Sequence, residues 1–196
     1  MSPIIQTLAN GSALGYRSLS AAAAADTGAM FPLQVITVGA AGASSVTFTN
    51  IPNTYTHLQI RAIQRNVSTN GYTRMQFNND TASNYSVHYL DGDGASALAG
   101  GTANNDHAYF GYSGTSSNSS IYGVAIVDIL DYANTNKYKT SRTFNGIDVN
   151  GSGGYVELGS SSWRSTSAIT SIKIAFGAGT NFAQYSQFAL YGVKTA

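Results

Sequence analysis

Short apolar runs separated by Gly, Asn and Ser clusters are the feature that most constrains how this chain can fold. The run "THLQIRAIQR" alternates, with Leu58 and Ile60 on one face and Gln59 and Arg61 on the other. Alternation with a period of two predicts β-strands that bury one face and leave the other in water. Runs of this kind occupy residues 31–38, 45–51, 56–65, 72–79, 85–90, 122–130, 137–149, 154–163, 168–176 and 186–193. With almost no helical pattern beside them, they predict an all-β fold: an antiparallel β-sandwich of the jelly-roll kind.

Two regions fall outside this pattern. Residues 91–120 form the longest stretch of low hydrophobicity, and we predict a long functional or mobile loop there. The first thirty residues include the helix-tolerant "SALGYRSLSAAAAAD", which has an internal glycine and no clear amphipathic face. We therefore predict an extended or partly helical N-terminal attachment arm over residues 1–30 and a β-sandwich domain over residues 31–196.

Composition narrows the classes of function. Charged residues make up 10% of the chain and its formal net charge is +1, which argues against nucleic-acid binding because that needs a basic face. The chain has no cysteine, which removes disulfides, thiolate zinc sites and cysteine nucleophiles together. We read no signal peptide at the N-terminus and no apolar run of 18 residues, so we expect no export signal and no membrane insertion.

Asp128 and Asp131, in and after the apolar run "IVDIL", are the first candidates for acid–base chemistry or metal binding. Asp128 shares a strand face with Ile126, whereas Asp131 falls on the other face or in the following turn, so the two carboxylates do not face each other across a substrate. We predict a structural role for them, in capping the turn "DYANTNK" or in pairing with Arg142 on the next strand. Because the chain has a single glutamate, it offers few acids for catalysis, and we predict no catalytic residue.

No other motif predicts a cofactor or metal site. The segment "DGDG" (91–94) starts like a calcium loop, but positions 6 and 12 of such a loop fall on Ser96 and Thr102, so a glycine-rich turn is favoured. His57, His88 and His107 show no metal-binding spacing, and no Gly-x-Ser-x-Gly elbow occurs. A calcium site assembled from several loops remains an open alternative.

Aromatic residues in predicted loops are the more informative candidates. Tyrosine and tryptophan offer rigid contact area with a polar group attached, as sugar-stacking sites and protein interfaces both require. The alternative is that these rings pack in the sandwich or cover its ends, and for Trp163 packing and ligand contact are equally favoured. The candidate ligand or interface contacts are Tyr109, Phe110, Tyr112, Tyr155 and Trp163.

Four strings suggest a family: "IPNTYTHLQIRAIQRN", "FNNDTASNYSVHYLDGDG", "DILDYANTNKYKTSRTFNG" and "AITSIKIAFGAGTNFAQYSQFALYGVK". Together with the opening "LANGSALGYRSLSAAA", the chain resembles virion proteins of tailed bacteriophages: tail-fibre, tail-tip, head-fibre or decoration proteins. The resemblance implies a β-sandwich on the exterior of the virion, commonly a homotrimer, attached through its N-terminal arm to other virion proteins. It carries no catalytic signature.

Three functions are our hypotheses for this chain. The first is a non-enzymatic virion structural protein, a tail or head fibre whose sandwich takes part in host recognition by binding a surface glycan through loop aromatics. The second is a capsid decoration protein that stabilises the head and binds nothing on the host. The third is a polysaccharide-degrading enzyme on the same scaffold. In each case we expect assembly in the cytoplasm of the host bacterium, without an export signal.

Overall fold

The computed structural model describes residues 29–68, 71–113, 120–149, 153–177 and 179–194. The chain divides into two compact units, one spanning Met30–Val193 and the other comprising Met1–Ala29 with Lys194–Ala196. In the second unit only Ala29 and Lys194 are described, so the predicted arm over residues 1–30 lies almost wholly outside the described residues. All the described strands and the core between them belong to the first unit.

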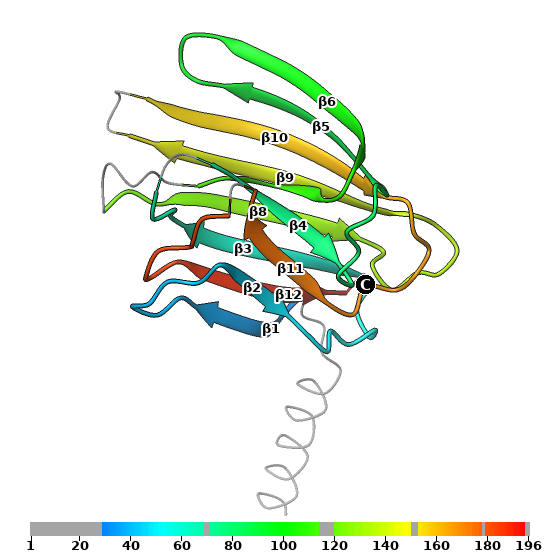
Figure 1. The fold of residues 1–196 in the computed structure, drawn as a ribbon. Helices are drawn as coiled ribbons and strands as arrows, with labels where there is room; N and C mark the ends of the chain where they lie inside the picture. Colours follow the sequence, from blue (N-terminus) through cyan, green and yellow to red (C-terminus); the bar gives the residue numbers. More distant parts are fainter. Residues whose placement is uncertain (1–28, 69–70, 114–119, 150–152, 178, 195–196) are drawn as a thin grey trace, which may run out of the picture. The chain divides into compact units, whose positions relative to one another are not determined.

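Every regular element in the described part of the chain is a β-strand, and the strands form two antiparallel sheets (Figure 1). The larger sheet has the order β1-β12-β3-β8-β9-β10-β5-β6, and the smaller has the order β2-β11-β4-β7. The strands are β1 (Met30–Thr37), β2 (Ser45–Phe48), β3 (His57–Gln64), β4 (Tyr72–Phe77), β5 (Tyr85–Gly92), β6 (Ala97–Asn105), β7 (Ala108–Tyr112), β8 (Gly123–Leu130), β9 (Lys139–Asp148), β10 (Gly154–Trp163), β11 (Ile172–Phe176) and β12 (Gln187–Val193). The all-β, antiparallel β-sandwich predicted from the sequence is confirmed, and its jelly-roll form stays a prediction.

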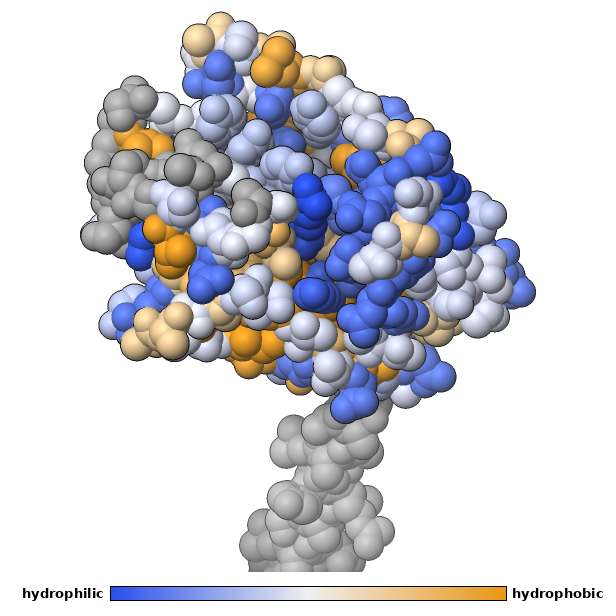
Figure 2. All heavy atoms as spheres, viewed as in Figure 1, coloured by the Kyte–Doolittle hydropathy of each residue, from blue (hydrophilic) through white to orange (hydrophobic). Residues whose placement is uncertain are grey.

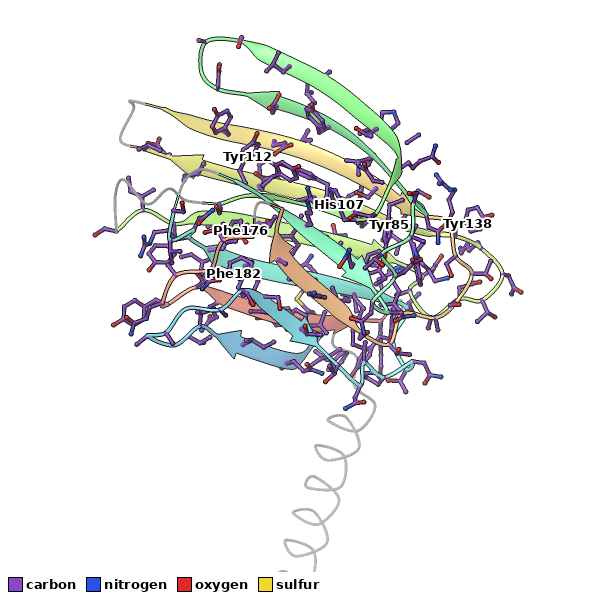
Figure 3. All side chains as sticks on the ribbon, viewed as in Figure 1. Tyr85, His107, Tyr112, Tyr138, Phe176 and Phe182 are labelled. Atoms are coloured by element: carbon purple, nitrogen blue, oxygen red, sulfur yellow. The ribbon has the colours of Figure 1, made fainter. Side chains whose placement is uncertain are left out.

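The core lies between the two sheets and is built from alternate residues of each strand. Leu58 and Ile60 of β3 are fully buried, and Met75 of β4 and Ile174 of β11 face them from the smaller sheet. Removing these apolar side chains from water is the main favourable contribution to folding. At one end of the core, Phe176 and Phe182 pack with ring centroids 4.5 Å apart (Figure 3). The buried face predicted from the alternation of Leu58 and Ile60 is therefore correct for β3.

The prediction of one long loop over residues 91–120 is wrong. Residues 97–105 and 108–112 of that region form the strands β6 and β7. β6 is the end strand of the larger sheet, and every one of its residues is at least partly exposed. A strand that buries nothing needs no apolar pattern, since the backbone hydrogen bonds to β5 hold it in place. Its sequence, "ALAGGTANN", therefore resembles a loop.

No helix among the described residues is long and apolar enough to cross a membrane.

Candidate functional site

A cavity of about 380 Å³ lies where the larger sheet extends past the edge of the smaller one. β7 is the edge strand of the smaller sheet, and the inner faces of β5, β6 and β10 continue beyond it. Two of the lining residues, His107 and Tyr112, are labelled in Figure 3. We call this space the tyrosine cavity, and its walls comprise Tyr72, Val87, Tyr89, Asp91, Leu98, Thr102, Asn105, His107, Tyr109, Tyr112 and Glu157.

Three tyrosine rings form a row along this cavity. Tyr109 lies in the middle, with its ring centroid 6.4 Å from that of Tyr72 and 6.3 Å from that of Tyr89. Tyr109 is buried, whereas Tyr72 is 40% exposed and Tyr89 is 36% exposed. Gly159 of β10 makes room for the middle ring, because a Cβ added there would lie 2.9 Å from Cδ1 of Tyr109. The row therefore has an anchored centre and two accessible ends.

Two carboxyl groups lie side by side on the wall of the cavity. Glu157 of β10 and Asp91 of β5 are direct cross-strand partners, and both point to the inner face of the larger sheet. Glu157 is 1% exposed, and its Oε2 accepts hydrogen bonds from the Tyr109 hydroxyl and, at 3.1 Å, from Asn145 Nδ2. Asp91 is 9% exposed, and its Oδ1 is buried without a hydrogen-bond partner among the described residues. Because a buried, unpaired carboxylate oxygen is costly, a hydrogen-bond donor that reached this atom would stabilise it.

Burial shifts the titration of this cluster. It raises the pKa of Glu157, and the negative charge of Asp91 adds to the shift, while the donors Tyr109 and Asn145 oppose it. Burial also raises the pKa of the Tyr109 hydroxyl, as does its hydrogen bond to Glu157, so this hydroxyl stays protonated and donates.

His107 supplies a further polar group on the cavity wall. Its Nδ1 lies 2.5 Å from Asp106 Oδ1, and its ring lies 6.3 Å from that of Tyr72. Burial lowers the pKa of His107 despite this hydrogen bond, so the ring is neutral at pH 7. The hydrogen bond from His107 lowers the pKa of Asp106, which is therefore an ionised acceptor. The ring proton then lies on Nδ1, and Nε2 is an acceptor.

The structure divides the five aromatic candidates between cavity and core. Tyr109 and Tyr112 line the cavity, and Tyr155 stacks on Tyr112 with ring centroids 4.9 Å apart. Phe110 is fully buried and packs against Phe188, so the structure places this candidate in the core. Trp163 is also buried, and its indole N–H donates to Asp80 at 2.7 Å, which decides between its two open alternatives in favour of packing.

Asp128 and Asp131 have the structural surroundings that the sequence predicted. Asp128 lies opposite Arg142 on β9, with 4.0 Å between the closest charged atoms, and accepts a hydrogen bond of 2.9 Å from Gln59. Asp131 follows β8 with a positive φ of 49° and forms an ion pair with Lys137 across the turn. Asp128 therefore contributes to the pairing of β8 with its neighbours, and Asp131 contributes to the turn. Neither carboxylate lines the tyrosine cavity.

The segment "DGDG" contains both a turn and a site residue. Asp93 Oδ1 accepts hydrogen bonds from the backbone N–H groups of Ala95 and Ser96, so the predicted glycine-rich turn is confirmed at this point. Asp91 instead belongs to β5 and points into the cavity. Among the described residues, no group of three or more His, Asp or Glu side chains could hold a metal ion.

Four site residues, Glu157, Asp91, Tyr72 and Tyr89, were not predicted from the sequence. Each lies on a strand, where polar and aromatic residues at alternate positions are ordinary. One signal was available: the only glutamate of the chain falls in phase with the inward positions of "GYVELGSSSW", and an acid at such a position needs an explanation. Its partner on β5 depends on long-range register, which the sequence alone does not give.

Comparisons with known proteins identify no family for this chain. No family model matches it, and no curated protein matches it. Among solved structures, galectin LEC-6 from Caenorhabditis elegans is 7% identical, with a TM-score of 0.31 over 82% of this chain and 96% of the galectin. SCLam, a non-specific endo-β-1,3(4)-glucanase from family GH16, is 9% identical, with a TM-score of 0.19 over 71% of this chain and 58% of the glucanase. At these TM-scores neither likeness carries an argument about this chain.

Proposed function

We propose that the tyrosine cavity binds a saccharide and that the chain is a non-enzymatic carbohydrate-binding β-sandwich. The observation that carries this proposal is the unpaired, buried Oδ1 of Asp91 in a cavity that the two partly exposed tyrosines Tyr72 and Tyr89 also line. A volume of about 380 Å³ lies at the lower end of the range for small-molecule sites.

The chemistry of the wall fits a neutral polyol. Sugar hydroxyl groups donate hydrogen bonds, and Asp91 Oδ1 and His107 Nε2 are acceptors on residues that line the cavity. The apolar face of a sugar ring packs on a tyrosine ring, and the tyrosine hydroxyl adds a polar group at the edge of that ring. Two neighbouring carboxyl groups repel anionic sugars, so neutral or amino sugars are favoured over uronic and sialic acids.

We propose that this saccharide binding is the task of a virion protein. The strings that resemble phage virion proteins support a fibre or tail component that binds a host surface glycan, attached to the virion through residues 1–30. A decoration protein of the head would use the same scaffold without a ligand, and the tyrosine cavity favours the fibre over the decoration protein.

A glycoside hydrolase is the second candidate, because one observation favours it. Glycosidases use two carboxyl groups, one of them with a raised pKa as the general acid. Glu157 has a raised pKa, and Asp91 is its direct neighbour on the next strand. Glu157 is nearly inaccessible, however, and its Oε2 already accepts two hydrogen bonds. Binding without turnover is therefore our first choice.

The test is an array of neutral, amino and acidic oligosaccharides probed with the full chain, followed by calorimetric titration of the best binder. We expect a neutral or amino sugar to bind and Asp91→Asn to weaken binding about 10- to 100-fold, the usual worth of a hydrogen bond to a charged group. Tyr89→Ala removes stacking area and should weaken binding as well. The control is Tyr138→Ala, since Tyr138 is 55% exposed in the β8–β9 connection and lies outside the cavity (Figure 3).

Two results would overturn the proposal. Binding that Asp91→Asn and Tyr89→Ala leave unchanged would place the saccharide elsewhere. Release of reducing ends from the bound oligosaccharide, abolished by Glu157→Gln, would make the hydrolase the function.

A further inference from the structure

The outer face of the larger sheet, opposite the core, carries an apolar surface. Ile126 of β8, Phe144 of β9, Leu158 of β10 and Leu90 of β5 are successive cross-strand partners, so they form one row across four strands. A second row lies beside it, in which Val124 and Val156 flank Gly146. We call this surface the outer apolar face, and its large side chains are Leu90, Val124, Ile126, Phe144, Val156 and Leu158.

These large apolar side chains are exposed to solvent. Each is between 41% and 59% exposed, and together they present on the order of 600 Å² of apolar surface, the upper end for the largest patch on a monomer. By contrast, Figure 2 shows the side of the smaller sheet as mostly hydrophilic, with small separate apolar patches. The outer apolar face is close to the roughly 800 Å² that each partner contributes to a standard interface.

The outer apolar face is hollowed on both sides of one aromatic side chain. Two hollows, of about 610 Å³ and about 860 Å³, lie on it, and Ile126 and Phe144 line both. Phe144 is 53% exposed between them. A two-fold contact is isologous, so each copy would present both its Phe144 side chain and these hollows to the other copy. Face-to-face packing of antiparallel sheets about 10 Å apart is the arrangement that buries such side chains.

The charges agree with a self-contact. A polar row borders the apolar rows, in which Asp128 and Arg142 are cross-strand partners with opposite charges. Because the pair is internally balanced, two copies of the face do not repel each other, and an apolar centre with a polar border is the usual anatomy of an interface. Arg61 of β3, the cross-strand partner of Ile126, and Asp148 of β9 add one charge of each sign beside the apolar rows, so these charges are balanced as well.

We propose that the outer apolar face is the contact with a second copy of this chain, in a two-fold, face-to-face pair of sandwiches centred on Phe144. The pair buries the exposed rows of both copies and leaves the tyrosine cavity open, because that cavity opens on the inner side of the larger sheet. The contact does not depend on saccharide binding. Its symmetry differs from that of the trimer implied by the resemblance to fibre proteins, and a mass measurement distinguishes the two.

Sedimentation velocity and equilibrium on the full chain test this pairing. We expect a species of twice 20.5 kDa at micromolar concentration, and we expect Phe144→Asp to raise the dissociation constant at least about 30-fold, which corresponds to a hot-spot loss of about 2 kcal/mol. Leu158→Asp, on the same row, should act in the same direction. The matched control is Tyr138→Asp, an equally exposed aromatic residue outside the face, which should leave the dimer intact.

Near-ultraviolet circular dichroism verifies that each variant is folded, which is expected because the substituted side chains are exposed. A wild-type chain that stays monomeric at about 100 µM would overturn the proposal. A trimer, or a dimer that neither aspartate substitution weakens, would also overturn it. If the chain is a monomer that sediments with phosphatidylcholine vesicles, and Phe144→Asp abolishes this co-sedimentation, the face would be assigned to a lipid surface instead.

Discussion

At the scale of single residues, Tyr109 organises the tyrosine cavity. Its ring lies against Gly159, its hydroxyl donates to Glu157, and its backbone N–H donates to Ser161 Oγ at 2.9 Å. Its carbonyl oxygen accepts a hydrogen bond of 3.2 Å from Thr143. Strand β7 is thereby joined to β9 and β10 of the other sheet by polar contacts. Since buried polar groups are costly unless paired, these contacts fix the position of the Tyr109 ring in the middle of the tyrosine row.

Glutamine in place of Glu157 should change how stability depends on pH. The folded state raises the pKa of Glu157 above its ordinary 4.5, so the folded chain holds this proton more tightly than the unfolded chain does. The free energy of unfolding contributed by this group is therefore greatest below pH 4.5 and falls as the pH rises through the folded pKa. Glu157→Gln keeps an oxygen acceptor for Tyr109 and does not titrate, so its stability relative to wild type should increase over that interval.

Urea unfolding at half-unit steps from pH 4 to pH 8 measures this difference. Asp148→Asn serves as the control, because Asp148 is exposed on β9 and lies outside the tyrosine cavity. A wild-type curve parallel to that of Glu157→Gln throughout would mean that the carboxyl group titrates as it does in the unfolded chain.

Residue pairs that are near in the chain could be predicted from the sequence. Asp93 with Ser96 and Asp131 with Lys137 are local pairs that turn chemistry predicts. The burial of a side chain by segments that are distant in the sequence could not be predicted. Lys139 is 1% exposed because its ammonium group donates to the carbonyl oxygens of Asn134, Lys137 and Thr166, and nothing in "NKYKTS" distinguishes it from a surface lysine.

At the scale of strands, alternation in the sequence reveals a strand only when the strand buries large apolar side chains. β3 and β11 bury large residues at every second position, and the alternation of Leu58, Ile60, Ile172 and Ile174 reveals them. β6 consists mostly of alanine, glycine and asparagine, and its place in the sheet follows from pairing with β5. The cavity exists because β5 and β6 continue the larger sheet past β7, so the region hardest to predict is also the one that forms the site.

Alanine in place of Gly159 should damage the cavity through β10. The added Cβ would lie 2.9 Å from Tyr109 Cδ1, so the ring must move and its hydrogen bond to Glu157 is strained or lost. We expect a stability loss of about 1–3 kcal/mol, the usual cost of overpacking, and a weakening of saccharide binding by about tenfold. Denaturant unfolding and calorimetric titration measure the two effects.

Gly92→Ala is the matched control for this substitution. Gly92 also lies on a strand next to the cavity, but its nearest neighbour for an added Cβ is the Ser96 carbonyl oxygen at 3.8 Å, an ordinary contact. Equal losses from both alanine substitutions would show that strand glycines are needed for a reason other than the Tyr109 ring.

At the scale of the whole molecule, the two faces of the larger sheet carry different proposed tasks. Its inner face packs the core and forms one wall of the tyrosine cavity, and its outer face carries the exposed apolar rows. A face-to-face pair would therefore present two cavities that remain accessible together. Two weak saccharide sites held in one particle bind a repetitive glycan surface more tightly than either alone, because the second contact is intramolecular.

Removal of residues 1–28 should leave the sandwich folded. Among the described residues, every member of the buried core cluster lies between Val38 and Leu190, and β1 begins at Met30, where it pairs with β12. Residues 30–193 also form a compact unit of their own. Since the apolar burial that stabilises a domain is contained in this unit, we expect the thermal midpoint of the shortened chain to stay within about 4 °C of the full chain, a change of less than about 1 kcal/mol. The saccharide affinity should be unchanged, because the residues described as walls of the cavity all lie between Tyr72 and Glu157.

Differential scanning calorimetry and titration with the same oligosaccharide measure both quantities on the two chains. The control is a deletion that continues through Thr37 and removes β1, which should lower the midpoint because the edge of β12 then loses its partner. If loss of residues 1–28 alone abolished the cooperative transition, the sandwich would depend on the arm for its stability, and attachment to a virion would not be the arm's separate function. If the shortened chain folds and binds as expected, its absence from assembled particles would then assign attachment to residues 1–28.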